Sequence, residues 1–143
     1  MEYKKELFES YKNEFLKEET KNGKEAALRH MRNLFYRKLK PAYDAMQFKK
    51  GDPYDFARVV SERDRSVGLE VSVKVASPKK IIYIFYTDPF PFEELKKKAT
   101  HREFDDCYMA FKLEYLLGSD WHYKTTKHVW DGDRYTEHVI EKG

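Results

Sequence analysis

The segment WHYKTTKHVWDGDRYTEHVIE, residues 121–141, decides the fold class of this chain. Asp131-Gly132 lies at its centre and is typical of a two-residue type I′ turn between antiparallel strands. The flanks, residues 121–130 and 133–141, mix apolar and polar side chains with the two-residue period of strands that bury one face. We therefore predict a β-hairpin at this end of the chain.

The predicted turn also fixes which residues share a face. Trp130 would lie opposite Asp133 and Thr125 opposite His138, and opposed residues project from the same face of an antiparallel pair. The inward face would then carry Trp121, Tyr123, Thr125, Val129, Thr136, His138 and Ile140. The outward face would carry His122, Lys124, Thr126, His128, Glu137 and Glu141.

A second hairpin is expected earlier in the chain. Leu69, Val71, Val73 and Val75 alternate with polar residues, which indicates a half-buried strand. Residues 81–87 form a nearly continuous apolar run, as expected of a strand at the centre of a sheet.

Apolar residues at helical spacing precede and separate these strands. Pro41 is expected to end or kink the second helix, because proline removes a backbone hydrogen bond. Asp52-Pro53 is typical of an N-cap followed by proline in the first turn. The expected helices cover residues 3–20 and 24–40, a third segment from Pro53, and residues 92–99 and 103–117.

The order of elements predicts an α+β fold, ααα-ββ-αα-ββ, with a four-stranded antiparallel sheet built from two hairpins. The length of 143 residues fits a single domain, 1–143. Its helical part is residues 1–66 and its sheet-containing part residues 67–143.

Composition narrows the function classes. The net charge is +3, and the 28 basic and 25 acidic residues are interspersed, so we expect no nucleic-acid partner. No apolar run is long enough for a membrane span, and the single cysteine excludes an intramolecular disulfide. We expect a cytoplasmic protein with no membrane partner and no cofactor.

The polar residues of the predicted inward face are the first site candidates. His138 is either a core histidine bonded to a neighbouring hydroxyl or a base in a ligand pocket. Cys107 lies in an apolar helix stripe with Phe104 and Phe111, and Glu114 is an unusual carboxylate in that stripe. Packing of this helix on the hairpin would place Cys107 and His138 at one shared pocket. No ligand set for a metal is evident, and His122 and His128 are expected in solvent.

The half of the chain from Val67 to Lys142 resembles the L-2-amino-thiazoline-4-carboxylic acid hydrolase family. The resemblance rests on the loop Pro89-Phe90, on Cys107 in the following helix, and on the hairpin residues Thr125, Gly132 and Asp133. Asp88 and Thr136 stand where the family has cysteines. The family is similar in layout to four-vinyl-reductase-like small-molecule-binding domains.

The resemblance implies a hydrolase acting on a C–N or C–S bond of a small cyclic amidine, amide or thiazoline-like compound. Cys107 or water would be the nucleophile, His138 the base, and Asp88 or Glu114 the orienting carboxylate. The expected substrate-binding residues are Trp121, Tyr123, Thr125, Thr136, Phe111 and Glu114. The alternatives are a non-catalytic ligand-binding or sensor domain and a dimerising structural module, which would make a homodimer.

Overall fold

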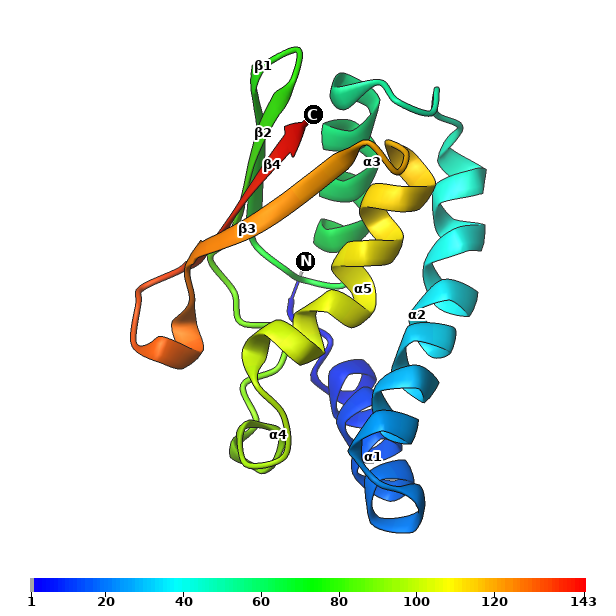
Figure 1. Ribbon diagram of the computed structural model, residues 1–143, viewed down its shortest axis with the longest axis vertical. Helices are drawn as coiled ribbons and strands as arrows, with labels where there is room; N and C mark the ends of the chain where they lie inside the picture. Colours follow the sequence, from blue (N-terminus) through cyan, green and yellow to red (C-terminus); the bar gives the residue numbers. More distant parts are fainter. Residues whose placement is uncertain (1) are drawn as a thin grey trace.

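The computed structural model describes residues 2–143, in which three helices lead into the sheet (Figure 1). They are α1 (Lys5–Asn22), α2 (Lys24–Met46) and α3 (Pro53–Ser66). Asp52 caps α3 as predicted, because its side chain accepts hydrogen bonds from the backbone N–H groups of Tyr54 and Asp55. Pro41 does not end α2. The turn beyond it buries the whole side chain of Tyr43, which offsets the hydrogen bond that proline removes.

The sheet confirms the predicted α+β class. Its strands are β1 (Val71–Ser77), β2 (Lys80–Phe85), β3 (Trp121–Lys127) and β4 (Thr136–Lys142), all antiparallel in the order β1-β2-β4-β3. Each predicted hairpin forms, and the two hairpins join through β2 and β4. Tyr83 pairs with His138 at that central contact.

The connection of the last hairpin differs from the prediction. Thr125 does pair with His138, but Lys127 pairs with Glu137, so β3 carries one extra residue at Thr126. Such a bulge reverses the direction of the side chains that follow it. A 3₁₀ turn, Val129–Asp131, then replaces the two-residue turn.

His128 is consequently buried, with 4% of its surface exposed, and the prediction that it points to solvent is wrong.

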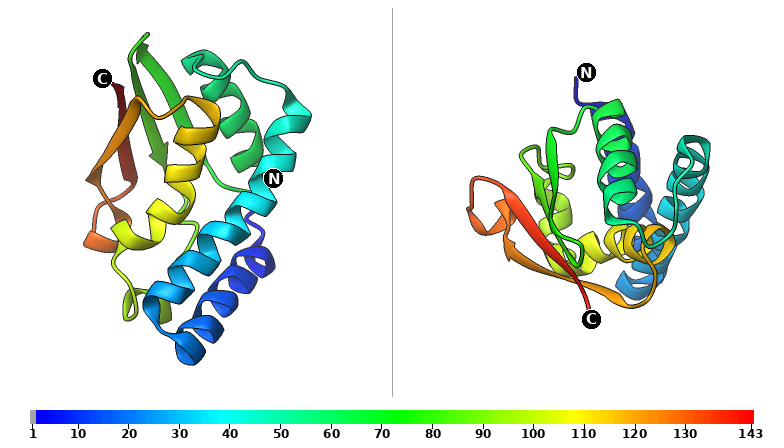
Figure 2. Two further views of the ribbon diagram at one scale, coloured as in Figure 1. Left: turned by 45° about the vertical axis from the view of Figure 1, so that its right-hand side comes forward. Right: turned by 90° about the horizontal axis from the view of Figure 1, so that it is seen from above.

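The helices lie on one side of the sheet (Figure 2). Helix α4 (Glu93–Lys96) and helix α5 (His101–Leu116) connect the two hairpins, and α5 runs between the sheet and α2. Thr100 caps α5 in a capping box with Glu103. Side chains of the helical and sheet-containing parts form one hydrophobic cluster.

Helix α5 is buried on two sides. Phe104 packs on Phe15, and Phe111 packs on Tyr36 and Tyr43, so this stripe faces α1 and α2. The sequence predicts that this stripe packs against the hairpin, and that prediction is wrong because α1 and α2 cover it. The side facing the sheet carries polar residues instead, at the helical spacing His101, Asp105, Tyr108 and Lys112.

The start of the chain is held against the loops beside the sheet. The backbone N–H of Lys4 donates to the carbonyl oxygen of Val67 at 3.0 Å, and the Tyr3 hydroxyl donates to that of Pro89 at 2.7 Å. Gly68 has a φ of 84°, and a Cβ there would lie 2.0 Å from the carbonyl oxygen of Glu2. None of the helices in residues 2–143 is long and apolar enough to cross a membrane.

Candidate functional site

Cys107 faces the helices and not the sheet. Its Sγ lies 3.5 Å from the carbonyl oxygens of Leu28 and Glu103, to which the thiol donates. Burial raises the pKa of the Cys107 thiol to about 12. The thiol therefore remains protonated at neutral pH, as in a cysteine that serves as a small core residue.

His138 lies in the core of the sheet with no exposed surface. Its Nδ1 is 2.9 Å from the hydroxyl of Thr125, and the rings of Tyr83, Phe85 and Tyr123 surround its imidazole edge-on. Burial lowers the pKa of His138 to about 4, so the imidazole is neutral at pH 7.

This environment matches the first of the two interpretations of His138, which is a core histidine bonded to a neighbouring hydroxyl. Neither His138 nor Cys107 lines any of the three hollows described below, so the structure does not place them at one shared pocket.

Asp88 and Thr136 lie together at the end of the sheet. Asp88 accepts a hydrogen bond from the backbone N–H of Phe90 at 2.9 Å, and burial raises the pKa of its carboxyl group. The two residues line a small hollow of about 10 Å³ with Asp105 and His128. That volume holds about one water molecule.

Four of the predicted substrate-binding residues do come together. Trp121, Tyr123, Thr125 and Glu114 line an open cleft of about 630 Å³, which we call the α5–β3 cleft after its two walls. Phe111 does not reach it, because its ring stacks among the aromatic residues of α2 and α5. The cleft is large enough for an organic ligand.

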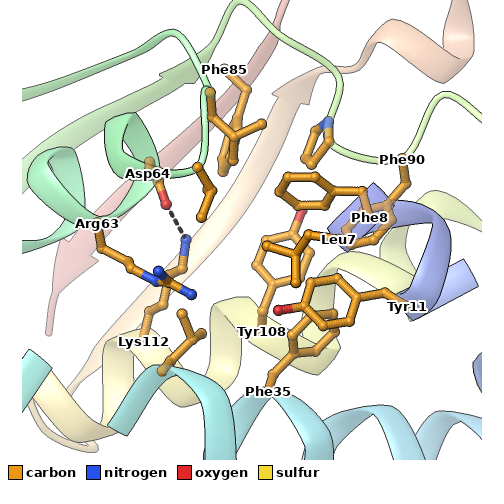
Figure 3. A pocket seen from close by; sticks show the side chains of 14 residues that line it. Leu7, Phe8, Tyr11, Phe35, Arg63, Asp64, Phe85, Phe90, Tyr108 and Lys112 are labelled. Atoms are coloured by element: carbon orange, nitrogen blue, oxygen red, sulfur yellow. Dashed lines mark hydrogen bonds and ion pairs between the residues drawn. The ribbon is translucent and has the colours of Figure 1, made fainter. Parts of the chain in front are cut away.

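A second space, the core cavity, was not foreseen from the sequence (Figure 3). Its volume is about 50 Å³, enough for roughly three to five water-sized groups. The three charged groups in its wall are Arg63, Asp64 and Lys112. The remaining lining residues are Leu7, Phe8, Tyr11, Phe35, Leu39, Val67, Leu69, Phe85, Pro89, Phe90 and Tyr108.

Lys112 is the central polar group of this cavity. The Lys112 Nζ donates a hydrogen bond to the Tyr83 hydroxyl at 2.8 Å and lies 3.4 Å from one carboxylate oxygen of Asp64. The other carboxylate oxygen of Asp64 accepts a hydrogen bond from the Tyr83 hydroxyl. The side chains of Lys112 and Asp64 are only 4% and 5% exposed. The ammonium group also lies over the rings of Phe85 and Tyr108, at 5.5 and 5.2 Å from their centroids.

Burial dominates the electrostatics of this group. It lowers the pKa of Lys112, an effect that Asp64 opposes and the Arg63 guanidinium reinforces. Burial also raises the pKa of Tyr83, as does the neighbouring Asp64 carboxylate, so the phenol keeps its proton. Burial thus favours the neutral form of the Lys112 amine in the cavity wall, while the Tyr83 hydroxyl bonded to it keeps its proton.

Arg63 adds a second positive charge at the cavity wall. It is half-buried and extends from α3 towards Lys112 (Figure 3). No carboxylate of residues 2–143 forms an ion pair with its guanidinium group. The single carboxylate of the cavity wall, that of Asp64, pairs with Lys112 and not with Arg63.

The sequence holds a signal for these residues. Asp64 follows Val60 by four positions and precedes Val67 by three, so it lies on the apolar face of α3. Lys112 follows Tyr108 by four positions in α5 in the same way. A charged residue of each sign on the buried faces of two helices predicts a buried ion pair.

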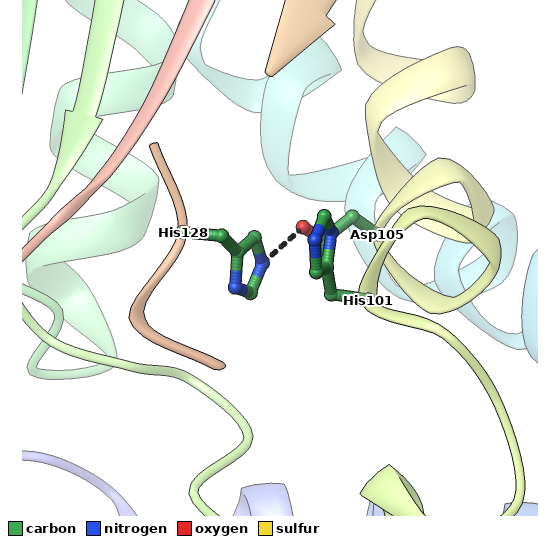
Figure 4. A group of neighbouring side chains, drawn as sticks. All are labelled: His101, Asp105 and His128. Atoms are coloured by element: carbon green, nitrogen blue, oxygen red, sulfur yellow. Dashed lines mark hydrogen bonds and ion pairs between the residues drawn. The ribbon is translucent and has the colours of Figure 1, made fainter. Parts of the chain in front are cut away.

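A third group of polar residues lies nearer the last hairpin (Figure 4). His128 Nε2 is 2.8 Å from the Asp105 carboxylate, and the His101 ring stacks on the His128 ring with 3.9 Å between centroids. The possible ligand atoms of these three residues lie within 4.8 Å of one another.

The hydrogen bonds of His128 argue against a metal in this group. The backbone N–H of Trp130 donates to His128 Nδ1 at 3.0 Å. A neutral imidazole whose Nδ1 accepts a hydrogen bond carries its proton on Nε2, which donates it to Asp105. A metal at Nε2 would require the opposite tautomer, in which Nδ1 is the donor. The three residues form a hydrogen-bonded and stacked cluster.

Comparison of the chain with models of protein families gives no match, and comparison with curated proteins gives no significant match.

Proposed function

We propose that this protein binds a small organic carboxylate in the core cavity. The observation that carries the proposal is the pair of cations, Arg63 and Lys112, in an apolar wall with only Asp64 as a counter-charge. A carboxylate ligand would restore electroneutrality in a site where burial makes an unpaired charge costly. The apolar and aromatic lining would receive the rest of the ligand.

The arrangement also supports selectivity for a particular shape of anion. A guanidinium group binds a carboxylate with two parallel hydrogen bonds, whereas an ammonium group acts as a point charge. A carboxylate held by Arg63 would direct its carbon chain towards Lys112 and the surrounding rings.

The α5–β3 cleft is a second candidate for the ligand, because its volume of about 630 Å³ suits a larger molecule. It contains four of the residues that the sequence predicted to bind a substrate. The compound named in the resembled family is itself a small cyclic carboxylate, so both spaces are tested with the same type of ligand.

Hydrolysis remains a prediction. The protonated Cys107 thiol faces α2, and the neutral His138 lies in the solid core, so our proposal assigns neither of them a reaction. A dimerising module also remains an alternative. Trp121, a large aromatic residue of the kind that such an interface would use, is 4% exposed and so is already covered within the chain.

The proposal is tested by titrating the protein with acetate, propionate, isobutyrate, benzoate and 2-amino-thiazoline-4-carboxylate, each beside its neutral amide. Thermal melting and calorimetry would report binding. We expect at least one acid to bind and raise the melting temperature, and its amide to do neither.

Arg63→Met should weaken the binding of that acid about tenfold or more, since the loss of a charge-assisted hydrogen bond costs roughly 1.5–3 kcal/mol. Arg65→Met is the matched control, because Arg65 is exposed on the same helix and does not line the cavity. If an acid binds the Arg63→Met variant as tightly as the parent protein, its binding site is not the core cavity. Loss of that binding in Glu114→Gln or Trp121→Phe would then indicate the α5–β3 cleft.

A further inference from the structure

We propose that Lys112 forms a covalent imine with a small 2-oxo acid in the core cavity, with Tyr83 as the proton donor. This inference rests on the proposed carboxylate site, to which it adds the chemical class of the ligand. A carboxylate bound at Arg63 would place the adjacent carbonyl carbon of a 2-oxo acid on the side of the cavity that Lys112 lines.

The geometry around Lys112 provides the groups that imine formation needs. The nucleophile must be a neutral amine, and apolar surroundings together with a second cation favour the loss of its proton. Lys112 has both, since its side chain is only 4% exposed and Arg63 lines the same cavity. Asp64 can accept the proton, and the Tyr83 hydroxyl bridges Asp64 and Lys112.

The reaction balances with these residues alone. The Lys112 ammonium gives one proton to Asp64, and its free electron pair forms a bond to the carbonyl carbon. The carbonyl oxygen takes one proton from the attacking nitrogen and a second from Tyr83, which Asp64 reprotonates, and it leaves as water. The product is a protonated imine, which keeps the positive charge of Lys112 beside the Asp64 carboxylate.

The test is reductive trapping. The protein is incubated with dilute pyruvate or glyoxylate and sodium cyanoborohydride at pH 7, and the modified residue is identified by peptide mass spectrometry. We expect one adduct per chain, on Lys112. Tyr83→Phe should slow its formation on the order of 10²-fold, because it removes the general acid. Lys74→Met, a variant of an exposed lysine that lines none of the three hollows, should form the adduct at the parent rate.

Lys112→Met would leave Asp64 buried without its cation, so the double variant Lys112→Met/Asp64→Asn serves as a folded, amine-free control. Propionate and lactate, which lack the carbonyl group, are titrated in parallel. Adducts confined to exposed lysines, with propionate still bound, would overturn the imine and leave the carboxylate site standing. Absence of both an adduct on Lys112 and binding of any acid would overturn both proposals.

Discussion

Replacing Lys112 by methionine would leave the Asp64 carboxylate in the core with the Tyr83 hydroxyl as its one side-chain partner among residues 2–143. Methionine has about the length of lysine, so the cavity wall would keep its shape while the positive charge disappears. The carboxylate would then have to remain unpaired in an apolar site or take up a proton. Both outcomes destabilise the folded state relative to the unfolded one at neutral pH.

The magnitude follows from the burial of both groups, which are 4% and 5% exposed. Removal of one partner of a buried ion pair costs about 3–5 kcal/mol, whereas replacement of both partners can be close to neutral. We therefore expect Lys112→Met to lower the melting temperature by roughly 10–15 °C. Lys112→Met/Asp64→Asn should be at least about 2 kcal/mol more stable than the sum of the two single changes predicts.

Urea unfolding of the parent, both single variants and the double variant, followed by circular dichroism at pH 7, gives the free energies for this cycle. Additive effects, or a cost of Lys112→Met below about 1 kcal/mol, would refute the reasoning. Either result would mean that water reaches the pair and screens it as it does a surface ion pair.

Further predictions concern individual residues. The pKa of His138 is about 4 in the folded chain and near 6.5 in the unfolded chain. Between these pH values the unfolded state binds more protons than the folded state. The free energy of unfolding should therefore fall by roughly 3 kcal/mol from pH 6.5 to pH 4. His138→Gln should lack this part of the pH dependence, and a parallel decline in both proteins would contradict it. Gly68→Ala should lower the free energy of unfolding by more than about 2 kcal/mol, because the new Cβ would collide with the backbone of Glu2. Gly132→Ala should lower it by about 1 kcal/mol, because Gly132 has a φ of 97° but open space around it. Cys107 should react with a thiol reagent at pH 8 only as fast as the protein unfolds, and rapid labelling of the native protein would disprove its burial. A chelator should leave the melting temperature unchanged within about 1 °C, and a fall of many degrees would reveal a structural metal.

Local patterns were sufficient to predict most of the fold. The cap at Asp52-Pro53 and the alternation from Val71 to Val75 each depend on residues close in sequence, and both appear where expected. The bulge at Thr126 could not be predicted in this way. The bulge allows His128 to turn inward and bond Asp105, which lies 23 residues away in the chain.

The candidate site was harder to predict for a related reason. Lysine and aspartate are almost always exposed, and neither Lys112 nor Asp64 was predicted from the sequence to belong to a site. The burial of Lys112 depends on two partners that are distant in the sequence. Asp64 lies 48 residues away from Lys112 and Tyr83 lies 29 residues away. The burial of α5 on two sides was also difficult to predict. A single apolar stripe was visible in the sequence, and nothing in its spacing indicated whether helices or the sheet would cover it.

The position of α1 has a consequence for the kinetics of binding. Leu7, Phe8 and Tyr11 of α1 close one side of the core cavity, and two hydrogen bonds, from Lys4 and Tyr3, hold the start of this helix in place. Helix α1 packs mainly on α2 and lies outside the β-sheet, so its opening would leave the hydrogen bonds between the strands intact. If a ligand must wait for this opening, the observed rate of binding will level off as the ligand concentration rises, and the plateau will equal the rate at which α1 opens.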